Sequence, residues 1–170
     1  MKTLSLLPVF LGLAAVPLPA AETTPSRISV EFDHPEKFTD VRDAYSPSDK
    51  GRDAILSNIR QFVEHRADRL LPPGDSLKVT FTDIKLAGDY EPWRGPNWDN
   101  VRIVKPIYPP DLKFTYSVRD ASGRVVKQGS DDLRDLDFQM RGADPSNDDP
   151  LRYEKSMLGD WLQDNLRKFK

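Results

Sequence analysis

The segment that decides the fold is residues 112–129, LKFTYSVRDASGRVVKQG. Apolar and polar side chains alternate along 112–119, which is the two-residue period of a half-buried strand. The turn at 120–123 ends in Gly123, and glycine suits the left-handed position of a type I turn with a bulge. The chain then returns over 125–129. These features predict an antiparallel hairpin.

Three further strands are expected before this hairpin. Residues 28–32 and 77–86 alternate in the same way, and 101–105 is a short strand candidate. After the hairpin, an acidic run at 131–137 indicates a solvated face. Within and just after that run, three apolar side chains are expected to turn inward: Leu133, Leu136 and Phe138.

Two segments have the apolar spacing of amphipathic helices. The first follows Ser46-Pro47, a serine cap with proline in the first turn, and it ends at Pro72-Pro73-Gly74. The second opens at Asp149-Pro150 by the same logic. Its expected inner face is Leu151, Glu154, Leu158, Trp161, Leu162, Asn165 and Phe169. The order of elements predicts an α+β fold, a largely antiparallel sheet of about five strands with both helices packed on one face.

The first residues have the pattern of a cleavable secretory signal. Lys2 precedes an apolar run at 4–15, and prolines and small residues follow. We expect cleavage after Ala20, with Ala21 as the alternative, so that 1–20 is the signal peptide and 21–170 is a single domain. The apolar run is too short for a transmembrane span, which needs about 20 residues. The chain also lacks the cysteine of a lipid anchor. The sequence therefore predicts a periplasmic protein in a Gram-negative host.

Composition excludes several classes of function. The chain of 170 residues has 25 Lys and Arg, 27 Asp and Glu, a net charge of −2 and no cysteine. This balance argues against a nucleic-acid binder, which needs a basic surface. The absence of cysteine excludes disulfides, thiolate metal sites and cysteine nucleophiles. With only His34 and His65 as histidines, and no nucleophile motif, no Ser-His-Asp arrangement is expected.

Aspartates offer a metal-binding alternative. The chain has 21 Asp and 6 Glu, and carboxylate oxygens suit Ca²⁺ or Mg²⁺. Residues 144–149 resemble the start of a calcium loop, but Asp149 stands where that loop needs glycine. A helix cap at Asp149 explains the same residues more simply. We therefore expect no metal site and no cofactor.

Residues 87–110 contain the best candidates for binding. This segment has five prolines and two glycines, and long loops without regular structure often carry function. Aromatic and arginine side chains supply many binding hot spots. The candidate residues are Tyr90, Trp93, Arg94, Trp98 and Tyr108. The alternative is that both tryptophans fold back over the open face or edge of the sheet.

The chain resembles the bacterial domain of unknown function 3016 family, small exported proteins found mostly in Gram-negative bacteria. The matching segments are Val30-Glu31-Phe32, Pro35, Phe38-Thr39-Asp40, residues 71–77, residues 82–88, Pro109-Pro110, the turn at 120–123, and residues 153–161. Lys85 departs from the acid expected at its position. The resemblance spans about residues 28–166 and implies export and domain extent, but it implies no activity.

Together these patterns predict a monomeric, exported, non-catalytic binding or accessory module for an envelope protein or glycan. The alternative is a divalent-metal-assisted hydrolase that uses clustered aspartates. A purely structural role in the envelope is the third interpretation.

Overall fold

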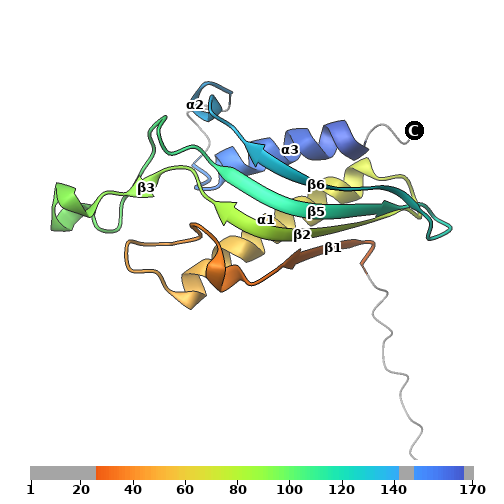
Figure 1. Ribbon diagram of the computed structural model, residues 1–170, viewed down its shortest axis with the longest axis horizontal. Coiled ribbons are helices and arrows are strands. Elements are labelled where there is room, and N and C mark those ends of the chain that lie inside the picture. The colour runs from red at the N-terminus through yellow and green to blue at the C-terminus, as the bar shows by residue number, and fades with distance from the viewer. Residues whose placement is uncertain (1–25, 142–147, 167–170) are drawn as a thin grey trace, which may run out of the picture.

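The computed structural model describes residues 26–141 and 148–166. The main sheet has four strands in the order β1-β2-β5-β6 (Figure 1). Strand β1 pairs in parallel with β2, and the other neighbours are antiparallel. The four strands are β1 (Ile28–Phe32), β2 (Ser76–Lys85), β5 (Asp111–Arg119) and β6 (Val125–Arg134).

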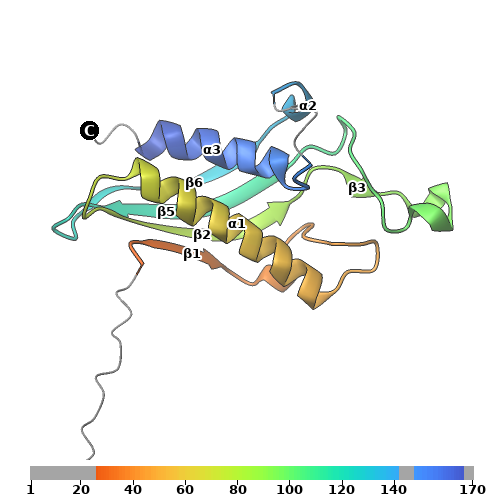
Figure 2. The same cartoon turned by 180° about the vertical axis from the view of Figure 1, so that it is seen from behind.

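Two long helices, α1 (Asp49–Leu70) and α3 (Arg152–Leu166), lie on the same face of this sheet (Figure 2). The remaining helical elements are short: η1 (Pro35–Lys37), η2 (Pro92–Arg94), η3 (Pro96–Trp98) and α2 (Phe138–Arg141). The opposite face carries Ser, Thr, Lys and Glu side chains from alternate strand positions. One buried and one solvated face is the usual arrangement of an antiparallel sheet, so the predicted α+β fold is confirmed.

The main sheet has one strand fewer than expected. The candidate at 101–105 does form a strand, β4 (Arg102–Ile103), but it pairs with β3 (Asp89–Tyr90) in a separate two-stranded ladder. Gly88 turns the chain away after β2, with a φ of 81°. A Cβ at this position would lie 2.8 Å from the carbonyl oxygen of Ile103. Glycine is therefore required both by the left-handed backbone and by the close approach.

The predicted hairpin is confirmed. Tyr116 pairs with Gly129, and a register shift lies next to Val118, close to the turn. Gly123 has a φ of 82°, in the left-handed region that the turn requires. Asp120 Oδ1 stabilises the turn by accepting from the backbone amide of Ser122 at 2.9 Å.

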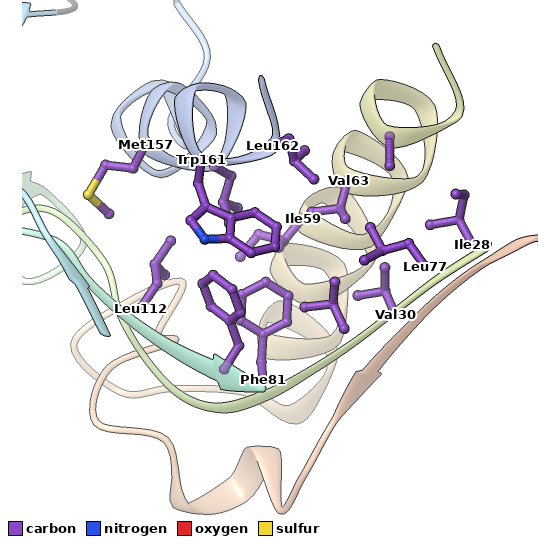
Figure 3. Packing of buried hydrophobic residues seen from close by; sticks show 14 of the residues in the cluster. Ile28, Val30, Ile59, Val63, Leu77, Phe81, Leu112, Met157, Trp161 and Leu162 are labelled. Carbon is purple, nitrogen blue, oxygen red and sulfur yellow. The ribbon is translucent and has the colours of Figure 1, made fainter. Parts of the chain in front are cut away.

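The core lies between the sheet and the two long helices (Figure 3). Three rings from β2, β5 and α3 pack in series. The ring centroids of Phe81 and Phe114 are 5.3 Å apart, and those of Phe114 and Trp161 are 4.9 Å apart in an edge-on arrangement. Ile59 on α1 and Leu162 on α3 are fully buried beside them. This packing fixes both helices on the sheet.

The helix starts differ in how well the sequence predicts them. Helix α1 is capped by Ser48, whose Oγ accepts from the amide of Gly51 at 2.9 Å, so the expected cap at Ser46 is wrong by two residues. The carboxylate of Asp43 accepts from the amide and the hydroxyl of Ser48, which fixes this serine as the cap. Asp149 opens α3 as expected, because its Oδ1 accepts from the amide of Leu151 at 2.9 Å.

The expected inner face of α3 is largely confirmed. Five of its predicted members are buried: Leu151, Glu154, Leu158, Trp161 and Leu162. Asn165 is half-buried, and Phe169 lies outside the described residues.

Among the apolar side chains of the acidic run, Leu133 and Phe138 pack inward. Leu136 is 65% exposed, and its prediction is wrong because β6 ends at Arg134 and strand alternation ends with it.

Candidate functional site

The candidate site is carried by an arm, residues 88–108, that leaves the sheet after β2 and returns before β5. Figure 1 shows this arm standing out beyond the end of the main sheet, with η2 and η3 at its far end. The amide of Gly88 donates to the carbonyl of Tyr108 at 3.0 Å, which closes the base of the arm. The arm is therefore a structured projection with two ends that meet.

A buried ion-pair network anchors the arm to the chain segment before α1. Asp40 is 5% exposed, and its two carboxylate oxygens accept from Arg102 at 2.9 and 3.1 Å. Arg42 donates to Asp40 at 2.9 Å and to Asp89 at 2.7 Å, so it joins that segment to β3. Paired guanidinium–carboxylate contacts of this kind fix geometry as well as charge.

The electrostatics of this network favour the ionised acid. Burial alone would raise the pKa of Asp40, but the hydrogen bonds and charges of Arg102 and Arg42 outweigh burial, and the pKa lies below its ordinary value. The ring of Tyr90 completes the anchor. It is 6% exposed, and the guanidinium carbons of Arg102 and Arg42 lie 4.7 and 5.5 Å from its centroid.

A second carboxylate, Glu91, ties the middle of the arm together. It is 1% exposed and accepts from Lys105 at 2.6 Å, from the Arg94 guanidinium and from the Tyr108 hydroxyl at 3.0 Å. These contacts, the lysine first, lower the pKa of Glu91 to about 2. Glu91 therefore stays ionised down to strongly acidic pH, and its pairs are lost only as the pH falls from the ordinary glutamate value of 4.5 toward about 2.

The tip of the arm exposes two indole rings. Trp93 is 73% exposed and Trp98 is 41% exposed. Arg94 follows Trp93 in the sequence, and the central carbon of its guanidinium group lies 5.6 Å from the centroid of the Trp98 ring. We call Trp93, Arg94 and Trp98 the tryptophan tip. The alternative in which both tryptophans cover the sheet is wrong, because their rings face solvent at the end of the projection.

The five residues predicted for binding thus divide into two groups. Trp93, Arg94 and Trp98 lie together at the tip, whereas Tyr90 and Tyr108 are built into the frame that supports it. The five residues therefore do not form one continuous exposed surface. Sequence patterns did not identify the residues that anchor the frame, because the contacts that join the arm to the segment before α1 link distant positions of the chain: Asp40 with Arg102, and Arg42 with Asp89.

The structure offers little to the metal-based alternative. No group of three or more His, Asp or Glu side chains among residues 26–141 and 148–166 could hold a metal ion. Of the calcium-loop-like segment, residues 144–147 lie outside the described residues, and Asp149 is engaged by Lys155 at 2.5 Å. His34 and His65 are both exposed. The aspartate hydrolase is therefore not favoured.

The structure is thus an α+β scaffold with both long helices on one face of the sheet. An anchored arm projects from it and exposes aromatic side chains. The chain belongs to the family described as Protein of unknown function (DUF3016), whose model matches residues 26–164. This match confirms the family resemblance seen in the sequence. Comparisons with curated proteins and with solved structures returned no match. None of the helices in the described ranges is both long enough and apolar enough to cross a membrane.

Proposed function

We propose that this protein is an exported, non-catalytic binding module, and that the tryptophan tip is its contact surface for a protein of the cell envelope. The observation that carries the proposal is the 73% exposure of Trp93 at the end of an ion-paired arm. A large apolar side chain held in water at the end of a projection is characteristic of an interaction site. Tryptophan and arginine are also the residues most enriched in binding hot spots.

The construction of the arm supports binding with little loss of conformational freedom. The ion pair between Asp40 and Arg102 fixes the base of the arm, and the ion pair between Glu91 and Lys105 fixes its middle. The tip is therefore ordered before any partner binds. Preorganisation of this kind raises affinity because less entropy is lost on binding. A projecting tip favours a partner with a complementary pocket, which is a protein surface rather than a polysaccharide chain.

Export is proposed from the pattern at the start of the sequence. Residues 1–20 have the signal-peptide pattern, although they lie outside the described residues, and periplasmic localisation follows if the signal is cleaved. A monomer with a free tip is the state that this function needs.

The test places a photo-crosslinking amino acid at position 93 in cells that make the protein. A control protein carries the same crosslinker at Met140, which is 87% exposed and lies outside the arm. We expect a discrete protein adduct from position 93 that is absent from position 140 and is lost in the Trp98→Ala variant. Equal adducts from both positions, or none from position 93, would overturn the proposal.

A second experiment distinguishes a protein partner from a glycan partner. Purified envelope polysaccharide is mixed with the wild-type protein and with the Trp93→Ala variant, and co-sedimentation is measured. We expect no sedimentation of either protein. Sedimentation that requires Trp93 would replace the protein partner with a glycan.

A further inference from the structure

The two edge strands of the main sheet, β1 and β6, differ in how far other residues cover them. At β1, the Arg60 guanidinium donates to the carbonyl of Val30 at 3.2 Å and stacks 5.2 Å from the ring centroid of Phe32, so this edge is partly covered. Within residues 26–141 and 148–166, strand β6 pairs with β5 alone. No side chain in the described part of the chain hydrogen-bonds to the backbone of β6. An open edge of this kind is a template for another strand unless it is protected.

A groove runs beside this open edge. Its volume is about 520 Å³, and it lies between the last part of β6, the turn that follows and the outward side of α3. In Figure 1, α3 lies along β6, and α2 is drawn beyond the end of that strand. Trp161 connects the two walls, because its Nε1 donates to Asp131 at 2.5 Å. The floor is apolar and consists of Leu133, Met157 and Trp161.

The rim of the groove has a strong negative charge. It carries five aspartates and one arginine: Asp132, Asp135, Asp137, Asp160, Asp164 and Arg134. Asp160 and Asp164 are exposed and lie four residues apart on α3. Negative potential also acts at the start of β5. Burial first, and the neighbouring Asp132 second, raise the pKa of Asp111.

These features together select one kind of occupant. A second copy of this chain would bring two acidic rims together, and close like charges oppose association. A basic segment would instead neutralise the rim. On a strand added to β6, every second side chain faces α3. A lysine or arginine there places its methylene stem on the apolar floor and its charge near Asp160 and Asp164.

We propose that the groove between β6 and α3 receives an extended basic segment of a partner protein, which adds to β6 as a fifth strand of the main sheet. Backbone hydrogen bonds to β6 supply affinity, and lysine or arginine at alternate positions supplies selectivity. This interaction does not involve the tryptophan tip.

The test uses synthetic peptides and the mature chain. A fluorescent peptide of alternating lysine and threonine, as long as the 10-residue β6, is titrated with the protein, and fluorescence anisotropy is measured. We expect saturable binding that weakens as salt is added. A matched peptide of alternating glutamate and threonine should not bind. Binding of both peptides, or of neither, would overturn the proposal.

Two variants with the same change of charge locate the site. Asp160→Asn with Asp164→Asn should weaken binding of the lysine peptide about tenfold, the effect of losing two partly screened ion pairs. The control is Asp49→Asn with Asp53→Asn, which removes two acids with the same spacing from α1. Circular dichroism checks that both variants fold. An equal loss of peptide binding in the two double variants would show a non-specific charge effect and would overturn the proposed site.

Strand addition is tested separately from charge. The lysine peptide is N-methylated at two lysines and two threonines, which blocks hydrogen bonding along both edges and keeps every charge. We expect this peptide not to bind, and unchanged binding would contradict strand addition. Sedimentation velocity at the same concentration should show a monomer, and a dimer would indicate that a second copy occupies the edge.

Discussion

The arm and the β5–β6 hairpin are held in place by different interactions, because the hairpin is part of the main sheet and the arm projects from it. The hairpin is fixed by local alternation and by a four-residue turn whose hydrogen bonds close within 120–124. The arm is fixed by ion pairs between residues that are far apart in the sequence, such as Asp40 and Arg102. The comparison shows that a projection without a core of its own can be ordered by buried ion pairs. It also shows that such order depends on very few residues.

The largest expected effect comes from the core, to which the β5 strand of the hairpin contributes and from which the arm projects. Phe114→Ala removes the central ring of the series between Phe81 and Trp161, and it should lower the free energy of unfolding by about 4 kcal/mol. Urea denaturation checks this value. The control is Trp93→Ala at the tip, which should change stability by less than about 0.5 kcal/mol. A large loss in the control would show that the tip is part of the core.

The next largest effect is expected in the arm and compares its stability with that of the main sheet. Asp40→Ala removes the buried carboxylate that Arg102 and Arg42 share, and loss of one partner of a buried ion pair typically destabilises by about 3 kcal/mol. Because that network joins the arm to the segment before α1 and does not include β5, hydrogen exchange should accelerate more in residues 88–108 than in β5. Uniform acceleration across both regions would mean that the arm and the sheet unfold as one unit.

Two glycines with similar backbone angles sharpen the comparison further. Gly88→Ala should destabilise by about 2 kcal/mol, because a Cβ would collide with the Ile103 carbonyl in addition to the strain of a positive φ. Gly123→Ala in the hairpin has open space around its Cβ and should lose only about 1 kcal/mol. Thermal denaturation of both variants measures the difference. Equal losses would show that backbone strain alone determines both values.

The smallest effect concerns the carboxyl group that connects α3 to the root of the arm. Glu154 is 1% exposed, its Oε1 accepts from the amide of Ala87 at 2.6 Å, and its Oε2 has no hydrogen-bond partner among the described residues. Burial is the main cause of its raised pKa. The stability that this group contributes is therefore present below the ordinary value of 4.5 and is lost as the pH rises through the raised pKa.

Glu154→Gln keeps an acceptor for Ala87 and removes the titration. The variant should be more stable than the wild type at pH 7, and the two should converge as the pH falls below 4.5. Melting temperatures measured across this range provide the check. A variant that is less stable at every pH would contradict burial as the source of the shift.

Much of the fold was predictable because its signals are local. The alternation of 28–32, 77–86 and 112–119 predicted three strands, and the apolar spacing before Pro72 predicted α1. Alternation cannot say which strands pair, however, so it could not show that β4 pairs with β3 and leaves the main sheet with four strands.

The candidate site was predictable only in composition. The richness of 87–110 in tryptophan and tyrosine marked the segment, but which rings are exposed depends on remote partners. Tyr90 became part of the anchor because Arg42 and Arg102 stack on it. Trp93 stayed exposed because nothing in the frame lies over it. The acidic run at 131–137 reads as solvated surface in the sequence, and only its position beside α3 makes it the rim of a groove.

The parallel pairing of β1 with β2 has a consequence for the order in which the fold assembles. Ile28 meets Leu77 only after the whole of α1 has been placed between them, whereas Tyr116 meets Gly129 across a short turn. Closing a long loop is slower than closing a short one, because more chain entropy is lost before any contact forms. We therefore expect β1 to join the sheet last. Pulse-labelling hydrogen exchange during refolding should protect the amides of β5 and β6 before those of β1, and the reverse order would contradict this pathway.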